Sequence, residues 1–191
     1  MARQLIPAHV QPDAASEVAG WLVAEWAHLY PDWDHQAAVA ELTACGAHGR
    51  PPRTWLLFEE FDDHHPGGLG AVIGSIGLGL DGELPAPSTR PDEESFDTHR
   101  VADGDRGDHA ARPAGVWVVN LFVTPAARGR GHGTALLKHA VTEARSMGIS
   151  ELLLTTEHSA DHYASLGWHR TGMIELNGHE SVLMRLPTMV R

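Results

Sequence analysis

The stretch Arg128-Gly129-Arg130-Gly131-His132-Gly133-Thr134 follows an apolar run over residues 116–123 and opens a helical pattern. Glycine lets the backbone approach a ligand closely and adopt positive φ, so successive N–H groups can point at one anion. The positive end of the helix dipole adds partial charge at the same place. A strand, a glycine-rich turn and a helix in this order therefore predict a binding site for a phosphate-bearing molecule.

This turn lacks the features of the two commonest phosphate-binding motifs. A P-loop needs a lysine directly after its last glycine, but the only lysine of the chain, Lys138, lies inside the helical pattern. A dinucleotide fingerprint needs the spacing Gly-x-Gly-x-x-Gly, whereas the glycines here are Gly129, Gly131 and Gly133. The spacing therefore disfavours ATP and dinucleotides as ligands.

The turn does match the pattern Arg/Gln-x-x-Gly-x-Gly/Ala, with Arg128, Gly131 and Gly133 at the specified positions. This pattern resembles the pyrophosphate loop of the GNAT superfamily of acetyl-CoA-dependent N-acetyltransferases. The preceding segment 121–125 is similar to the family's fourth strand, and the later segment 162–168 is similar to its Phe-Tyr-x-x-x-Gly-Phe element. The order and spacing of these features agree with the family over residues 116–175.

The resemblance implies that the turn and the strand before it bind acetyl-CoA. Backbone N–H groups of the turn, with the guanidinium groups of Arg128 and Arg130, would hold the pyrophosphate. The strand would pair with the pantetheine arm and present an N–H to the thioester oxygen. The alternative for Arg130 is a solvent-exposed charge. The implied cofactor-binding residues are Leu121, Phe122, Val123, Arg128, Gly129, Arg130, Gly131, His132, Gly133 and Thr134.

The same resemblance assigns Tyr163 as the general acid. A phenol with an ordinary pKa of about 10 suits protonation of a departing thiolate. The alternative is an amphipathic tyrosine that packs its helix against the sheet. His162 takes the place of the family's usual aromatic beside this tyrosine, and Thr156 stands seven residues before it, where the family often has asparagine.

A general base is not apparent in the sequence. Many family members carry a glutamate on the fourth strand, where this chain has Asn120, which can orient water or substrate but cannot take a proton. Glu59 and Glu60, at the end of an earlier strand, and Asp81 are weak substitutes, and each is also explained as a solvated strand-end charge. Bulk water is a further alternative.

The acceptor side is expected at the aromatic segment 26–33, because the family resemblance places the junction of the first two helices there. Trp26, Tyr30 and Trp33, together with Asn120, are the candidate acceptor residues. Aromatic walls with acidic neighbours suit a cationic amine. The alternative is packing between the helices, above all for Trp26, whose spacing places it on the core stripe.

Hydrophobic periodicity predicts an α+β chain whose element order is that of the GNAT fold. The length predicts a single domain over 1–191, and the GNAT resemblance implies a mixed, mostly antiparallel six- to seven-stranded sheet flanked by helices in three layers. The expected strands are 5–10, 54–61, 69–80, 116–123 and 151–156, and the expected helices are 13–29 with Asp13 as its cap, 34–45, 131–147 and a short one containing Tyr163. The proline-rich, acidic segment 81–114 is expected to be a flexible surface loop, with a lid at the acceptor side as the alternative.

Composition bounds the location and the partners. The 191 residues are 42% hydrophobic and 20% charged, with no apolar run near the roughly 20 residues that span a bilayer and no signal-peptide pattern. We therefore expect a cytoplasmic protein without a membrane partner. The net charge of −11 disfavours nucleic acid and is compatible with a cationic partner. A single cysteine, Cys45, excludes an intramolecular disulfide and is expected to be buried.

The histidines do not predict a metal site. His158 and His162 have the i, i+4 spacing of a zinc-binding pair, but the pattern His-Glu-x-x-His is absent and no third ligand is signalled. We therefore expect acetyl-CoA as co-substrate and no metal.

The sequence favours direct transfer of an acetyl group to a primary amine of a small molecule or peptide. The alternatives are a non-catalytic acyl-CoA sensor, which the missing base supports, and another nucleotide-phosphate binder; the oligomeric state, including a homodimer, is left open.

Overall fold

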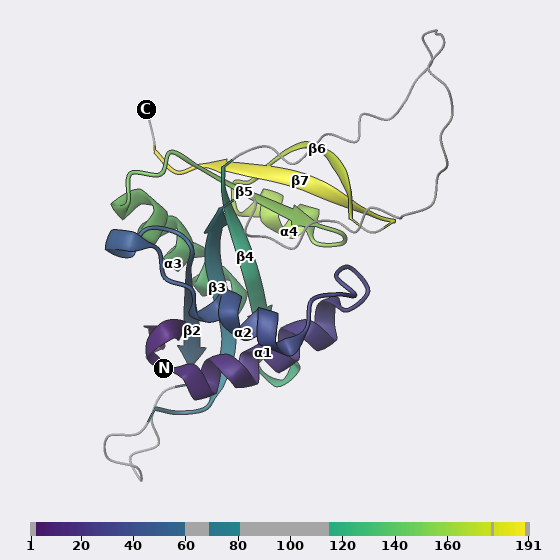
Figure 1. Cartoon of the computed structure of the whole chain (residues 1–191). Helices are drawn as coiled ribbons and strands as arrows, with labels where there is room; N and C mark the ends of the chain where they lie inside the picture. Colours follow the sequence, from purple (N-terminus) through teal and green to yellow (C-terminus); the bar gives the residue numbers. More distant parts are fainter. Residues whose placement is uncertain (1–2, 60–68, 81–114, 177, 190–191) are drawn as a thin grey trace, which may run out of the picture.

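The computed structural model describes residues 3–59, 69–80, 115–176 and 178–189, and its core is a seven-stranded mixed sheet (Figure 1). The strand order is β1-β2-β3-β4-β5-β7-β6, and every neighbouring pair is antiparallel except β4 and β5. The mostly antiparallel α+β sheet expected from the sequence is therefore confirmed. The segment 81–114 and Glu60 lie outside the described residues.

The elements follow the predicted order closely. The strands are β1 (Gln4–Pro7), β2 (Arg53–Phe58), β3 (Val72–Leu80), β4 (Val116–Val123), β5 (Glu151–Thr156), β6 (His169–Leu176) and β7 (His179–Pro187). The helices are α1 (Pro12–Trp26), α2 (His35–Thr43), α3 (His132–Ser146) and α4 (Ala160–Ser165), with short 3₁₀ turns at Ala8–Val10, Ala47–Gly49 and Pro125–Ala127. No helix within these described ranges is long and apolar enough to cross a membrane.

Three local expectations need correction. The first strand stops at Pro7, where a 3₁₀ turn begins, so it is shorter than predicted. Asp13 lies within the first turn of α1 and does not cap it, because Pro12 already occupies the first helical position. Cys45 is exposed, since α2 has ended two residues before it. By contrast, Asp34 caps α2 by accepting a hydrogen bond from the backbone N–H of Ala37 at 2.8 Å.

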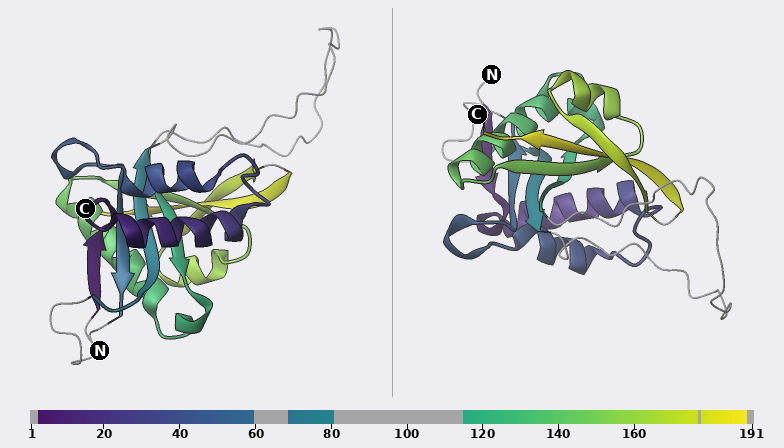
Figure 2. Two further views of the ribbon diagram at one scale, coloured as in Figure 1. Left: turned by 60° about the horizontal axis from the view of Figure 1, so that its bottom comes forward. Right: turned by 90° about the horizontal axis from the view of Figure 1, so that it is seen from above.

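Alternation along the strands divides the core into two faces. On β2, Trp55 and Leu57 pack in the cluster that contains α3, whereas Leu56 and Phe58 pack in the cluster that contains α1 and α2. Successive side chains of a strand point to opposite faces, so both faces of this strand are buried. Figure 2 shows the resulting layers, with α1 and α2 on one side of the sheet and α3 on the other.

A bulge interrupts this alternation on β4. Ser75 of β3 lies opposite Phe122 and Gly77 lies opposite Val119, so the two residues 120 and 121 on β4 face one residue of the partner strand. Asn120 has a φ of 54°, which asparagine tolerates better than most residues, and its carbonyl accepts a hydrogen bond from Ser75 Oγ at 2.7 Å. Because of the bulge, Asn120 faces the α1–α2 side, like Val119 directly before it.

The sheet divides beyond the bulge. The parallel pairing of β4 with β5 is recorded at Trp117 and Leu153, and the later part of β4 has no such partner on β5 among the described residues. Figure 1 shows β5, β6 and β7 running across the direction of β2, β3 and β4. The division therefore exposes one edge of β4 directly before the glycine-rich turn, where an added strand-like ligand could pair with it.

Candidate functional site

The glycine-rich turn has the backbone that the sequence predicts. Gly129 and Gly131 have φ values of 76° and 74°, and Gly131 is the left-handed residue directly before α3. A Cβ on Gly129, Gly131 or Gly133 would meet no atom within 4 Å, so the space over this helix N-terminus is open. The first N–H groups of a helix have no partner inside the helix. The turn thus offers room and donors for an anion.

Arginines surround this turn from two parts of the chain. Arg3 donates from Nη2 to the carbonyl of Arg130 at 3.0 Å, which brings a third guanidinium group to the turn, beside those of Arg128 and Arg130. Burial, followed by the charges of Arg3 and Arg130, lowers the pKa of His132, while Glu59 opposes the shift. The electrostatic surroundings are therefore favourable for phosphate. Arg3 was not predicted, because nothing in its spacing relates it to a turn over 120 residues away.

Arg128 is held differently from Arg130. Its Nε donates to the carbonyl of Val123 at 2.9 Å, its Nη2 lies 3.6 Å from the Glu25 carboxylate, and its guanidinium lies over the Phe122 ring at 5.5 Å. These contacts hold the end of β4 against α1. Arg128 therefore stabilises the position of the turn through its contacts with β4 and α1. Arg130 is largely exposed and reaches only Glu59, at 4.0 Å, among the described ion pairs.

A pocket of about 390 Å³ lies where β4 and β5 separate. Its walls come from the end of α1 and the following segment, from α2, from β4 and from the chain between β5 and α4. All four residues expected on the acceptor side contribute to the lining, namely Trp26, Tyr30, Trp33 and Asn120. Trp26 also packs in the core and Trp33 is buried, so these residues form the pocket wall and the helix packing together.

Glu41 of α2 places a carboxylate beside Asn120, the β4 residue at which the sequence lacks a general base. Asn120 donates from Nδ2 to Glu41 Oε1 at 2.8 Å, and both side chains line the pocket. The bulge explains this contact, since it turns Asn120 toward the helix. Glu41 was missed by the sequence analysis, although it follows the buried Ala38 by three residues and precedes the buried Leu42, next to the inward stripe of α2.

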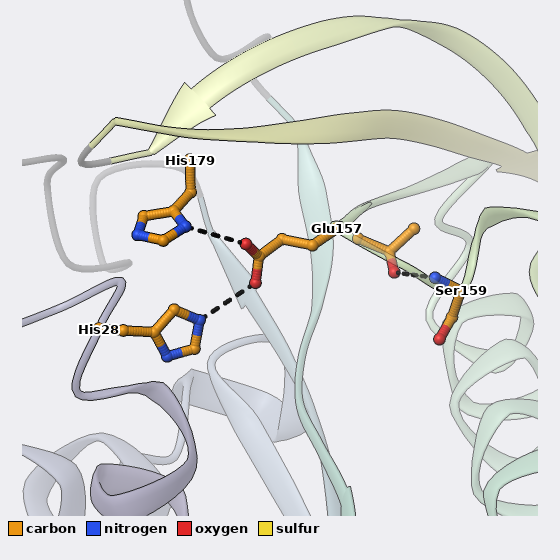
Figure 3. Close-up of polar contacts among 5 residues, drawn as sticks. His28, Glu157, Ser159 and His179 are labelled. Atoms are coloured by element: carbon orange, nitrogen blue, oxygen red, sulfur yellow. Dashed lines mark hydrogen bonds and ion pairs between the residues drawn. The ribbon is translucent and has the colours of Figure 1, made fainter.

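Tyr163 lies on α4 and also lines the pocket. Its ring meets Trp168 edge to face, with centroids 6.1 Å apart, and packs against the α3 side of the core. Burial raises the pKa of the Tyr163 phenol, which keeps the hydroxyl protonated at neutral pH. His162 beside it is exposed. Thr156 accepts from the Ser159 N–H at 3.0 Å and so closes the turn that leads into this helix (Figure 3).

Three other residues that the sequence predicted, Leu121, Phe122 and Glu59, lie in different surroundings. Leu121 lines the pocket, whereas Phe122 is buried against Trp21 of α1 with ring centroids 5.9 Å apart. Glu59 lies beside Arg130 at the turn and does not line the pocket. Of the two glutamates Glu41 and Glu59, Glu41 lines the pocket and Glu59 does not.

One further polar cluster was missed by the sequence analysis. The Glu157 carboxylate contacts two histidines, each at 3.2 Å (Figure 3). Its Oε2 lies next to His28 Nε2, and its Oε1 lies next to His179 Nδ1. His28 and Glu157 belong to the pocket lining. The three residues come from distant parts of the chain, so no spacing pattern could have found them. His158 and His162, which have zinc-like spacing in the sequence but were not expected to bind metal, are not part of this cluster.

Comparisons with known proteins agree with this arrangement. The chain aligns over its full length with an aminoglycoside 6'-N-acetyltransferase solved with coenzyme A (16% identity, 99% of that chain covered, TM-score 0.59). It aligns equally with the putative acetyltransferase yncA of Salmonella typhimurium solved with acetyl-CoA (17%, 96%, 0.58) and with the ribosomal-protein-S18-alanine N-acetyltransferase of Escherichia coli (16%, 96%, 0.57). At such identities the likeness concerns the fold.

A comparison with curated protein sequences gave no significant match. The model of the family described as "Acetyltransferase (GNAT) family" matches residues 17–173, which is most of the chain. The matched range contains strands β2 to β5, the glycine-rich turn, Tyr163 and all pocket-lining residues except Leu176 and Ser181. The chain therefore belongs to the GNAT family of acetyltransferases.

Proposed function

We propose that this protein is an acetyl-CoA-dependent N-acetyltransferase that transfers the acetyl group directly to a cationic primary amine. The observation that carries the proposal is the position of the pocket. It lies at the divided edge of β4, and the glycine-rich turn follows the end of the same strand after one 3₁₀ turn. A donor bound along β4 would thus have its phosphates at the turn and its acyl end in the pocket.

The residues at the turn fit a pyrophosphate. The open space over Gly129, Gly131 and Gly133 admits the group, the N–H donors at the start of α3 can bind it, and Arg3 and Arg130 supply positive charge. The exposed edge of β4 at 121–123 would pair with the amide-containing arm of the donor. Acetyl-CoA itself supplies an activated acyl group on a thiol that leaves readily.

Glu41 is the proposed proton acceptor for the amine. Its carboxylate lies at the pocket wall and is oriented by the hydrogen bond from Asn120. An acetyl acceptor must lose a proton to become nucleophilic, and a positioned carboxylate can take that proton directly or through one water. This assignment removes the main support for the non-catalytic sensor, which was the lack of a base on β4.

Tyr163 is the proposed proton donor to the leaving thiolate. Its hydroxyl is kept protonated by the raised pKa, and its side chain borders the same pocket as Glu41. The acid and the base come from α4 and α2, which lie on opposite sides of the division in the sheet. One group would therefore act on each side of the reacting centre.

The chemistry of the pocket favours a cationic acceptor. Glu25, Glu41 and Glu157 all contribute carboxylates to its lining, and Trp26 and Tyr30 contribute aromatic faces. Carboxylates and aromatic faces both attract ammonium groups. We therefore infer that the acceptor is a polyamine-like or aminoglycoside-like small molecule. A peptide whose first side chains are acidic or uncharged would fit this pocket less well.

The test is a thiol-release assay with acetyl-CoA and a panel of polyamines, aminoglycosides and peptides. We expect turnover with at least one cationic amine and its loss in Tyr163→Phe. Calorimetry with acetyl-CoA, ATP and NAD should show binding of acetyl-CoA alone. Tight acetyl-CoA binding without release across the panel, and with no effect of Tyr163→Phe on binding, would favour the sensor instead.

A further inference from the structure

We propose that His28, Glu157 and His179 form a binding site for a divalent transition-metal ion, with Zn²⁺ the best fit, at the rim of the acceptor pocket. The ligand atoms of the three residues lie within 4.8 Å of one another, and each imidazole is 3.2 Å from a different oxygen of Glu157. The site does not include the proposed base Glu41 or the proposed acid Tyr163, but it shares Glu157 with the carboxylates of the acceptor pocket, and it goes beyond the transfer reaction.

Two of the three pairs of ligand atoms, those between each histidine and Glu157, have a spacing close to that of tetrahedral coordination. Two ligands at the usual zinc distances of 2.0–2.1 Å are about 3.4 Å apart when they bind tetrahedrally. The two His–Glu distances already lie close to this value. Two imidazoles and one carboxylate form a ligand set that zinc uses with a fourth position left for water or another ligand. His28 would bind through Nε2 and His179 through Nδ1, which leaves the other ring nitrogen of each as the N–H.

The three ligand residues come from three separate parts of the chain, and the backbone around them is anchored by hydrogen bonds, packing or strand pairing. His28 follows α1, in a turn closed by hydrogen bonds from the N–H groups of Leu29 and Tyr30 to the Trp26 carbonyl, both at 2.9 Å. Leu29 is buried in the cluster that contains residues of β6 and β7, so this turn is anchored to the hairpin that carries His179. Glu157 directly follows β5. Such anchoring reduces the ordering cost of binding an ion.

The imidazoles are accessible while the carboxylate is protected. His28 and His179 have 46% and 42% of their side-chain surface exposed, against 19% for Glu157. Both described partners of the Glu157 carboxylate are these imidazoles, so its negative charge has no lysine or arginine partner in the described part of the chain. An ion could reach the site from solvent and would there meet an uncompensated carboxylate.

A bound ion would change the charge of the pocket rim. With neutral imidazoles the cluster carries one negative charge, and a divalent ion would change this to one positive charge. The ion would therefore remove one of the pocket carboxylates that attract a cationic acceptor, and would offer a coordination position to an oxygen or nitrogen of the acceptor. The metal would also join the segment after α1, the end of β5 and the β6–β7 hairpin.

The test is zinc binding by the full chain after treatment with a chelator. Zn²⁺ is titrated in competition with a chromophoric zinc indicator, and Co²⁺ is added separately so that visible absorption reports its geometry. We expect one ion per chain with a tetrahedral cobalt spectrum. His28→Ala, Glu157→Gln and His179→Ala should each weaken zinc binding by about 100-fold, since even the loss of an outer partner of a metal ligand costs about 10- to 100-fold.

His169→Ala is the matched control, because His169 is an exposed histidine of β6 outside the cluster. It should bind zinc like the unchanged protein. Thermal unfolding with chelator present should give the same melting temperature for all variants, and zinc should raise it only in the unchanged protein and in His169→Ala. Absence of one-to-one binding, or unchanged affinity in any of the three cluster variants, would overturn the site. Neither result depends on acetyl transfer.

Discussion

Replacing Glu41 by glutamine removes the proposed proton acceptor while preserving its shape. The amide oxygen of the new side chain can still accept the hydrogen bond from Asn120, which is 2.8 Å long in the structure. A positioned base typically contributes about 100- to 10,000-fold to the rate. We expect kcat to fall by about 100- to 1,000-fold, which corresponds to about 3–4 kcal/mol of transition-state stabilisation. The structure should be unchanged, so the melting temperature should stay close to that of the original protein.

Asn120→Ala gives a graded comparison. This change keeps the carboxylate but removes its orienting hydrogen bond, and a bond to a charged group is worth about 1.5–3 kcal/mol. We therefore expect a smaller loss of kcat than in Glu41→Gln, of about tenfold. Alanine tolerates the φ of 54° less well than asparagine, so the melting temperature of this variant is measured as well. Glu151→Gln, which alters an exposed ion pair with Arg185, is the control and should leave kcat unchanged, because neither residue lines the pocket.

The exchange variant Glu41→Gln with Asn120→Asp is the sharpest form of the experiment. It moves the carboxylate from α2 to the strand position and puts the amide on the helix, so the two side chains can still be joined by one hydrogen bond. Thiol release should recover at least tenfold relative to Glu41→Gln. The acidic limb of the pH–rate profile, which protonation of a base produces, should be absent in Glu41→Gln and return in the exchange variant.

Equal kcat in Glu41→Gln and the original protein would refute the assignment, provided that chemistry limits the rate. A single-turnover measurement settles that condition, because it observes transfer without product release. A rise in KM at constant kcat would also refute it, since Glu41 would then only attract the cationic acceptor.

Three further predictions concern other parts of the molecule. Tyr163→Phe should lower kcat about 100-fold and abolish the alkaline limb of the pH–rate profile, a limb that in the original protein should lie above pH 10 because burial raises the pKa of the Tyr163 phenol above its ordinary value of 10.0. Gly131→Ala should cost about 1 kcal/mol in urea unfolding because of its φ of 74°, whereas Gly133→Ala, without a positive φ, should leave stability unchanged and weaken acetyl-CoA binding in calorimetry. Burial and, to a smaller extent, Arg53 lower the pKa of His139 against the opposing charge of Glu143, so its contribution to stability is full above pH 6.5 and decreases as the pH falls below that value. His139→Gln should therefore narrow the difference in melting temperature between pH 7.5 and pH 5.5, and an unchanged difference would contradict this account.

The sequence predicted the bounds of strands and helices accurately where a capping or turn-forming residue stands at the boundary. The strand 116–123 was predicted to the residue, because an apolar run ends there at Thr124-Pro125. Asp34 and Gly131 marked the starts of α2 and α3 through capping and positive φ. The start of α1 was missed because Pro12 at the first helical position was overlooked in favour of Asp13.

The bulge at Asn120 could not be predicted from the pattern of β4. A strand buried on both faces shows a continuous apolar run, so a change in which residues face which side leaves no trace in its hydrophobicity. Asparagine inside such a run is the one local signal, and the sequence analysis interprets it as a missing carboxylate and as a residue that can orient water or substrate. The structure gives the residue a second role, since its positive φ is compatible with the bulge that turns β4.

Long-range contacts explain why both carboxylate sites escaped the sequence analysis. Asn120 and Glu41 are 79 residues apart, and His28 and Glu157 are 129 residues apart. Motif spacing detects ligands that share one helix or one turn, so it draws attention to His158 and His162, which the sequence analysis rejects as a metal site, and it cannot detect this cluster. Both contacts exist because the segment from α1 to α2 packs across the divided sheet, toward β4 at one end and toward the β6–β7 hairpin through Leu29 at the other. Apart from Arg3, the proposed donor site is therefore formed by one local turn, whereas the proposed acceptor site depends on how the N-terminal helices pack against strands that follow much later in the chain.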